Sequence, residues 1–168
     1  MTLIFRTEIP TDAPAIEALT LAAFKQAPHT SHTEHLILRA LRRTGRLTVS
    51  LVAQDGAQLV GHVALSPVRI SDGTPRWFGL GPISVLPARQ RQGIGTQLMV
   101  RALASLRERG AAGCVLVGDP AYYGRFGFTA MPQLQVAGVP PMYVLAHGLD
   151  GPVPAGLVSF DPAFAATA

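Results

Sequence analysis

The chain has 168 residues, of which 48% are hydrophobic and 14% are charged, so its composition excludes an intrinsically disordered protein. This length fits one domain with a sizeable core, and we expect a single domain over residues 1–168. The net charge is +4, with 14 Lys and Arg against 10 Asp and Glu. That balance favours an anionic small molecule as partner, and the scatter of the charges argues against nucleic acid.

The sequence also bears on the compartment. The first residues, MTLIFRTEIP, lack the basic start, apolar middle and small-residue cleavage site of a signal peptide. No apolar run has the length that a membrane span needs, so we expect no membrane partner. A single cysteine, Cys114, excludes an internal disulfide and a cysteine-rich metal cage. We therefore expect a cytoplasmic protein.

The first part of the chain predicts one strand and two helices. Ser31 and Glu34 have the spacing of a capping box, and the apolar residues after them recur at helical intervals. The predicted segments are a strand over Leu3–Glu8, a helix from Thr11 or Asp12 to about Lys25, and a helix from Ser31 that Gly45 ends.

Three β-rich runs follow. LTVSLVAQ (47–54) and LVGHVALSPVRI (59–70) are separated by DGAQ, which predicts a hairpin. The turn sequence SDGTP then leads to RWFGLGPISVL (76–86), a third predicted strand.

The second half begins with a helix predicted from about Gly93 to Arg109 on the apolar period of its residues. The later segments are an apolar strand CVLVG (114–118), a turn DPAYYGRFGF (119–128), short strands near Thr129–Val136 and Met142–Ala146, and twenty final residues expected over the surface. This order predicts an α/β layered (α+β) fold, with a mixed, mostly antiparallel central sheet flanked by helices. The strands before and after the Gly93–Arg109 helix form a β–α–β unit, so they should run parallel.

One stretch, LPARQRQGIGTQLM (86–99), predicts an anion-binding site. Gly93 and Gly95 let the backbone turn sharply or approach a ligand closely. Unpaired N–H groups at the helix start, the helix dipole and the charges of Arg89 and Arg91 together favour a phosphate or pyrophosphate. The alternative is that two glycines and a polar turn simply begin a helix.

The pattern selects among phosphate-binding motifs. A dinucleotide fingerprint requires a third small residue where this chain has Leu98, and no Gly-Lys-Ser/Thr follows for a P-loop. The segment Gln90–Gly95 instead resembles the Q/R-x-x-G-x-G/A signature of the GNAT superfamily of N-acetyltransferases. The resemblance implies that this loop and the preceding strand bind acetyl-CoA as co-substrate. The residues so implied are Ile83, Ser84, Val85, Gln90, Arg91, Gln92, Gly93, Ile94, Gly95 and Thr96.

A second motif strengthens the resemblance. YYGRFGF, Tyr122–Phe128, is similar to the later aromatic motif of the family, and the two motifs together resemble its YhbS-like branch over nearly the whole chain. The resemblance implies an N-acetyltransferase fold and direct acetyl transfer to a primary amine of a small molecule, peptide or protein. It also implies that Tyr123 protonates the leaving thiolate, whereas Tyr122 packs against the core.

The general base is left open by the sequence. The resemblance places Glu34 on the acceptor side and makes it the catalytic candidate for this base, although the capping box explains Glu34 as well. His62 lies in a β run and faces either the cleft or solvent. His29, His32 and His35 lack a zinc-like spacing, and we expect no metal site. Asp119 and Arg125 are interpreted as residues that fix the turn, and Cys114 as a core residue.

Other functions are compatible with these residues. A non-catalytic acyl-CoA sensor or interaction module would keep the same phosphate loop. Acetylation of an aminoacyl-tRNA would require a coherent basic face, which the scattered arginines do not predict. A homodimer is compatible with the sequence.

Overall fold

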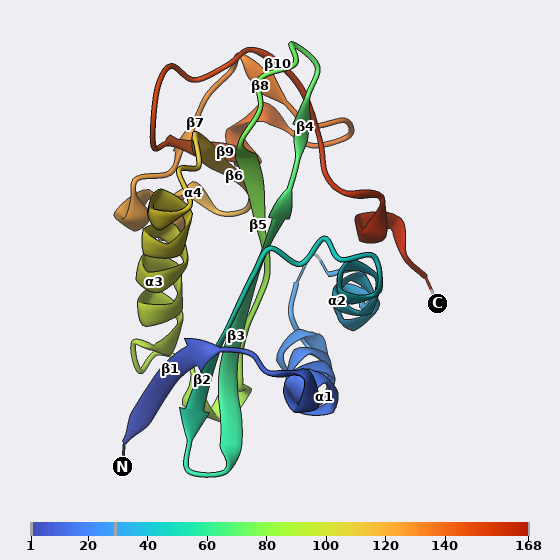
Figure 1. The fold of residues 1–168 in the computed structure, drawn as a ribbon, viewed down its shortest axis with the longest axis vertical. Helices are drawn as coiled ribbons and strands as arrows, with labels where there is room; N and C mark the ends of the chain where they lie inside the picture. Colours follow the sequence, from blue (N-terminus) through green and yellow to red (C-terminus); the bar gives the residue numbers. More distant parts are fainter. Residues whose placement is uncertain (1, 29, 168) are drawn as a thin grey trace.

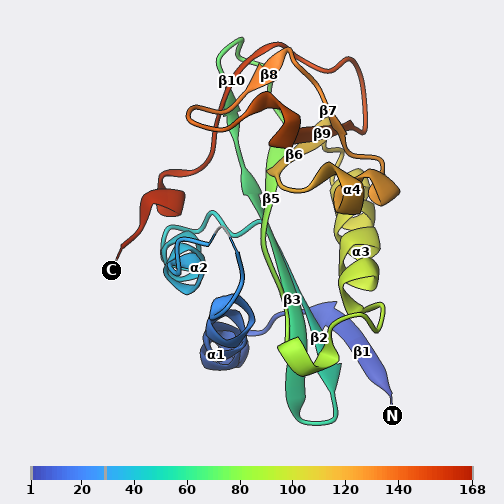
Figure 2. The ribbon, with the colours of Figure 1, turned by 180° about the vertical axis from the view of Figure 1, so that it is seen from behind.

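The computed structural model describes residues 2–28 and 30–167 (Figures 1 and 2). The helices are α1 (Ala13–Phe24), α2 (Glu34–Arg43), α3 (Ile94–Glu108) and α4 (Pro120–Tyr123), with short 3-10 turns η1 (Pro10–Asp12), η2 (Pro87–Arg89), η3 (Gly124–Phe126), η4 (Pro141–Tyr143) and η5 (Pro162–Ala165). The strands are β1 (Leu3–Thr7), β2 (Val49–Asp55), β3 (Gln58–Pro67), β4 (Arg69–Ile70), β5 (Trp77–Val85), β6 (Gly113–Val117), β7 (Thr129–Ala130), β8 (Leu134–Gln135), β9 (Val144–Gly148) and β10 (Gly156–Ser159). No helix of the described residues is long and apolar enough to cross a membrane.

The main sheet has seven strands in the order β1-β2-β3-β5-β6-β9-β7. Neighbouring strands are antiparallel except β5 and β6, which run parallel on either side of the connection through α3. Both the mostly antiparallel sheet and the parallel pair are as predicted.

Helices cover both faces of this sheet. Helices α1 and α2 lie on one face, and α3 lies on the other (Figures 1 and 2). The predicted apolar period of α3 is confirmed, because Ile94, Leu98, Ala102 and Leu106 are all at most 1% exposed. Close packing depends on Gly61 of β3, since a Cβ at that position would lie 2.8 Å from Ile94 Cγ2.

A second, small sheet was not predicted. It has three strands in the order β4-β10-β8. The run expected as one strand over 59–70 breaks at Pro67, and the run expected over 129–136 divides around Pro132, because proline cannot donate to a strand ladder. The final residues are more than a surface cover, since β10 pairs with both β4 and β8.

The feature that positions the site is the divergence of β5 from β6. Strand β5 pairs with β3 as far as Val85, but it pairs with β6 only over Trp77–Gly79. Within the described residues, no strand pairs with the other edge of β5 over residues 80–85. The backbone groups along that edge are therefore available to a ligand.

Candidate active site

A cavity of about 670 Å³ lies beside this open edge. It brings together strand β5, the loop before α3, the start of α3, and the α4–η3 segment. The residues that line it are Ile83, Val85, Arg89, Gln90, Arg91, Gly93, Gly95, Thr96, Tyr122, Tyr123 and Arg125. The two sequence motifs, separated in the chain by α3 and β6, therefore form one site.

The start of α3 presents free backbone N–H groups to this cavity. Its N-cap, Gly93, has a φ of 83° and no side chain to accept a hydrogen bond. The N–H groups of Ile94, Gly95 and Thr96 lack intrahelical partners because they belong to the first turn. The helix dipole adds partial positive charge at the same point. This geometry suits an anion, as the sequence predicted.

Two residues at this start have distinct roles. The side chain of Ile94 is 1% exposed and packs in the core, so only its backbone is offered to a ligand. Gly95 leaves room for Tyr122, because a Cβ there would lie 3.0 Å from the Tyr122 hydroxyl oxygen. The interpretation of Tyr122 as a packing residue is therefore incomplete, since it also lines the cavity.

Strand register decides which residues of β5 face the cavity. Leu86 N donates to Val60 O at 3.0 Å, so alternation directs the backbone of Ser84 toward β3 and that of Ile83 and Val85 toward the open edge. The carbonyl of Val85 accepts from Gln90 Nε2 at 3.2 Å. The side chain of Ser84 is 2% exposed, and the structure does not bring it to the cavity.

The arginines differ from what was expected. Arg89 does not contribute a free charge, because its Nη1 lies 2.8 Å from Asp55 Oδ2 and its Nε donates to Gln92 Oε1. Gln92 therefore accepts a hydrogen bond from Arg89 and does not line the cavity.

Arg125, expected to fix a turn, stacks over the Tyr122 ring at 4.7 Å and lines the cavity with Arg91. A sequence signal that could have identified this contact is the spacing of Tyr122 and Arg125, which are three residues apart in a helical segment. Asp119 does fix the turn, since it accepts from Ala121 N.

Tyr123 lies deeper in the cavity than Tyr122. Its ring packs against Gly118, where a Cβ would lie 2.5 Å from Tyr123 Cε2, and against Phe128 at a centroid distance of 6.4 Å. Burial, with smaller effects from Tyr122 and Asp119, raises the pKa of Tyr123 to about 12. The phenol is therefore protonated at neutral pH and able to donate a proton.

Glu34 lies away from this cavity. It lines a separate one of about 410 Å³ between α1 and α2, and its Oε2 accepts from Thr30 Oγ1 and Ser31 N. The N-cap of α2 is Thr33, so the predicted capping box is wrong in its cap residue. Ser31 Oγ instead accepts from Thr33 N in the preceding loop. The structure does not bring Glu34 together with Tyr123.

The remaining titratable candidates give no ligand cluster in residues 2–28 and 30–167, where no group of three His, Cys, Asp or Glu is arranged to hold a metal. His29 lies outside the described residues. Cys114 is buried in the core, as predicted, and burial raises the pKa of its thiol.

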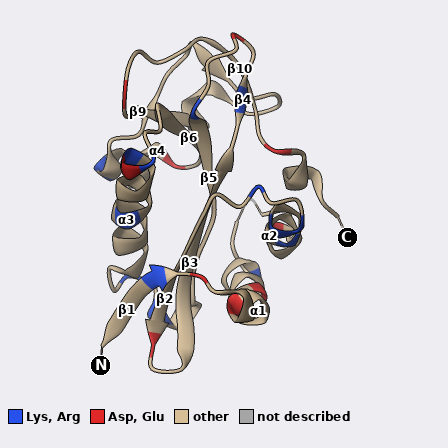
Figure 3. Ribbon diagram, viewed as in Figure 1, with Lys and Arg blue, Asp and Glu red and all other residues tan. Residues whose placement is uncertain are grey.

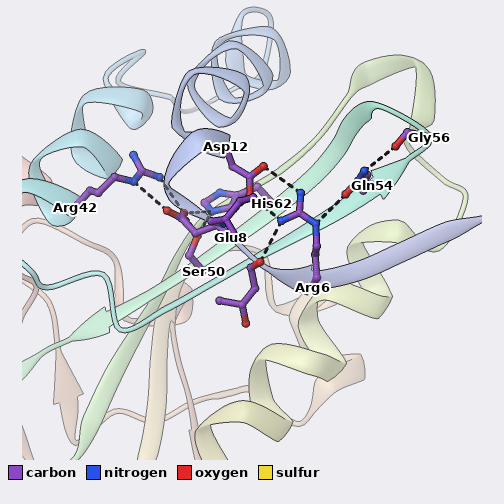
Figure 4. A network of polar contacts seen from close by, with 10 residues as sticks. Arg6, Glu8, Asp12, Arg42, Ser50, Gln54, Gly56 and His62 are labelled. Atoms are coloured by element: carbon purple, nitrogen blue, oxygen red, sulfur yellow. Dashed lines mark hydrogen bonds and ion pairs between the residues drawn. The ribbon is translucent and has the colours of Figure 1, made fainter.

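His62 faces neither the cavity nor solvent but belongs to a buried network (Figure 4). Its Nε2 lies 2.7 Å from Ser50 Oγ, and the Ser50 hydroxyl in turn bonds to Glu8, which pairs with Arg42 of α2 at 2.9 Å. Burial lowers the pKa of His62 to about 4, against the opposing effect of Glu8. The network joins the residue after β1 to β2, β3 and α2, and it stands apart from the residues that line the cavity.

Comparison with known proteins places this geometry in a family. A family model described as an acetyltransferase (GNAT) domain matches residues 6–131. YhbS of Escherichia coli K12, named an uncharacterized N-acetyltransferase, is 42% identical over 127 residues, which are 75% of this chain and 73% of YhbS.

Two solved structures are similar over nearly the whole chain. A GNAT family acetyltransferase from Brucella melitensis in complex with acetyl-CoA has 43% identity and a TM-score of 0.87, and the match covers 97% of this chain and 98% of that one. The YhbS structure from E. coli in complex with CoA has 35% identity and a TM-score of 0.87, with coverage of 99% and 93%.

Proposed function

The chain belongs to the GNAT family of acetyltransferases, and on that premise we propose which reaction it catalyses. We propose direct transfer of an acetyl group from acetyl-CoA to a primary amine of a small molecule, a peptide or a protein, with Tyr123 as the general acid. One observation carries the proposal: the open edge of β5, the uncapped start of α3 and the phenol of Tyr123 line the same cavity.

The cavity suits a long ligand with an anionic group. Its volume of about 670 Å³ is in the range of cofactor sites, and its polar end is the start of α3. Acetyl-CoA supplies an acetyl group already activated as a thioester. In the proposed complex, the N–H groups of Ile94, Gly95 and Thr96 donate to the diphosphate, and Arg91 and Arg125 add positive charge.

The edge of β5 would hold the rest of the ligand. Ile83 and Val85 offer backbone N–H and C=O groups to the amides of the pantetheine arm, in the manner of an added strand. Pro82 has no N–H, so this hydrogen-bonding edge cannot continue through it. An N–H of this edge is also the candidate donor to the oxyanion that forms when the amine attacks the thioester carbonyl.

Tyr123 would complete the reaction. As the new C–N bond forms and the C–S bond breaks, its phenol donates a proton to the leaving thiolate, while the attacking nitrogen loses a proton to solvent, from which the phenolate is reprotonated. A phenol with a pKa of about 12 is fully protonated but weakly acidic, so proton donation is coupled to C–S cleavage. The proposed contribution of Tyr123 therefore depends more on the position of its hydroxyl beside the leaving sulfur than on its acid strength.

Calorimetric titration with acetyl-CoA, followed by a thiol-release assay over a panel of primary amines, tests the proposal. Binding together with amine-dependent thiol release is the expected result. Binding without release on any amine would assign the protein as an acyl-CoA sensor, and absence of binding would contradict the ligand itself.

A further inference from the structure

A second cavity, larger than the first, lies on the α2 side of the sheet. It is an open hollow of about 910 Å³, lined by the last turn of α2, the junction of β3 and β4, and the C-terminal segment from Ser159 to Thr167. Figure 1 shows this segment descending from β10 to lie beside α2. Part of its lining is apolar, including Ala40, Val68 and Phe160. We call this space the arginine cavity, after the residues described next.

Three arginines line the arginine cavity: Arg43 and Arg46, which lie three residues apart at the end of α2 and just after it, and Arg69 of β4. Figure 3 shows charged residues on α2, on β4 and on the C-terminal segment around this region. Among the described residues that line it, Asp161 is the one with a carboxylate side chain. Arg46 Nε lies 3.2 Å from Asp161 Oδ2, and Asp161 Oδ1 accepts from Ala163 N.

The other two arginines have no such neutralising partner. Across residues 2–28 and 30–167, no carboxylate lies within ion-pair distance of Arg43 or Arg69. The lining therefore carries an excess of two positive charges above a partly apolar surface. A guanidinium presents paired N–H donors that match a carboxylate or a phosphate, so this surface is suited to one anionic group.

The arginine cavity also reaches the strand that carries the proposed reaction. The ring of Phe160 lies against Gly79, where a Cβ would be 2.8 Å from Phe160 Cε1. Gly79 pairs with Val115 and is the last residue of β5 that pairs with β6. The wall of the cavity thus touches β5 at the point where the open edge begins.

We propose that the arginine cavity holds the anionic end of the acceptor, so that the acceptor is an amine that also carries a carboxylate or phosphate. Arg43 and Arg69 bind the anion, and the rest of the acceptor extends along Phe160 toward the divergence of β5 and β6. This inference rests on the proposed acetyl transfer for its catalytic part, but the anion site itself is testable without turnover.

A length series of acceptors tests the substrate class. ω-Amino acids of three to six carbons are compared with alkylamines of equal length, and phosphoethanolamine with ethanolamine, by thiol release. We expect a lower KM for the anionic member of each pair. The acceptor length with the lowest KM indicates the distance between the arginines and the thioester carbonyl. Comparison of the carboxylate series with phosphoethanolamine shows which of the two anions the cavity binds.

The double substitution Arg43→Gln and Arg69→Gln tests the residues. Because each lost contact is a hydrogen bond to a charged group, we expect KM for anionic acceptors to rise about tenfold or more, with KM for alkylamines and the Kd of acetyl-CoA unchanged. Arg109→Gln, an exposed arginine at the end of α3, removes one positive charge elsewhere as the control. Equal KM values for anionic and neutral amines, or no effect of the double substitution, would overturn the proposal.

Equilibrium binding separates this inference from the proposed function. Calorimetric titrations with glutarate and with inorganic phosphate are made on the wild type and the double variant, both checked for folding by circular dichroism. Anion binding that the double variant loses supports the arginine cavity even if no amine is acetylated. No anion binding to the wild type contradicts it even if acetyl transfer occurs.

Discussion

Two helix starts in this molecule differ both in sequence and in what surrounds them. Helix α3 begins after Gly93, with no acidic residue in its first turn and no side-chain cap. Helix α2 begins with Glu34, whose carboxylate accepts from Ser31 N and from the hydroxyl of Thr30. The positive end of the α2 dipole therefore has a negative charge supplied by its own chain, whereas that of α3 has none.

The difference teaches how a helix start becomes a binding site. Every helix leaves N–H groups unpaired in its first turn, so this feature alone is not specific. At α3 the free groups open onto a cavity that an unpaired strand edge and two tyrosines also line. At α2 the carboxylate comes from the first residue of the helix, Glu34, and the preceding loop supplies the groups that donate to it. A helix start suits an anionic ligand where the chain itself supplies neither a partner for the unpaired N–H groups nor a negative charge near the positive end of the helix dipole.

The largest expected effect comes from giving α3 the negative charge that α2 already has. Gly95→Glu places a carboxylate where the diphosphate is proposed to bind, and its Cβ would also crowd the Tyr122 hydroxyl at 3.0 Å. Repulsion and lost hydrogen bonds should weaken acetyl-CoA binding by about 100-fold or more in calorimetry. Val100→Glu, on the exposed side of the same helix, is the matched control. Unchanged affinity in Gly95→Glu would remove the proposed phosphate site.

Tyr123→Phe should act on turnover and leave binding intact. Losing the proton donor is expected to lower kcat by about 100-fold, the usual contribution of general acid catalysis, with the Kd of acetyl-CoA unchanged. Tyr143→Phe, at an exposed tyrosine outside the cavity, controls for loss of a hydroxyl. A fully active Tyr123→Phe enzyme would exclude Tyr123 as the acid.

On the α2 side, the buried network predicts acid sensitivity of stability. His62 has a pKa of about 4 in the folded protein against an ordinary value of 6.5, so between these values the unfolded chain takes up a proton that the folded chain does not. The free energy of unfolding should therefore be highest above pH 6.5 and fall by up to about 1.4 kcal/mol per pH unit down to pH 4.

Urea unfolding across this range measures the effect, and the lowered pKa of Glu8 extends the loss to lower pH in the same direction. His32→Gln, at an exposed histidine outside this network, is the matched control for loss of an imidazole. A profile that is flat from pH 6.5 to pH 4 would contradict the buried, neutral state of His62.

The smallest effect is expected at the start of α2. Glu34→Gln removes the charge that serves the loop and the helix dipole, so stability should fall by about 1 kcal/mol while kcat and acetyl-CoA affinity stay within twofold. Chemical denaturation and the thiol-release assay measure the two quantities. A large loss of kcat at unchanged stability would instead support Glu34 as the general base. Both helix starts would then contribute to the reaction.

Much of the fold was accessible from sequence because its long elements carry their own period. The strand near residues 77–85 and the helix from Ile94 were predicted within a residue or two. The small sheet was not, because its strands β4 and β8 have two residues each and no pattern that short is informative. The arginine cavity was not predicted either, because Arg69 and Asp161 are distant in sequence from the pair Arg43 and Arg46.

The sequence by itself determined the family and the layered α/β fold, and it predicted the loop proposed to bind phosphate, because these depend on local patterns: glycines at a helix start and an apolar period in α3. Only the tertiary structure decided that Ile83 and Val85 face the cavity while Ser84 faces away, because that depends on the register of β5 against β3. It likewise showed Arg89 paired with Asp55 and Glu34 bound to its own loop. Whether a charged side chain is available to a ligand depends on partners distant in sequence, and a local pattern does not contain them.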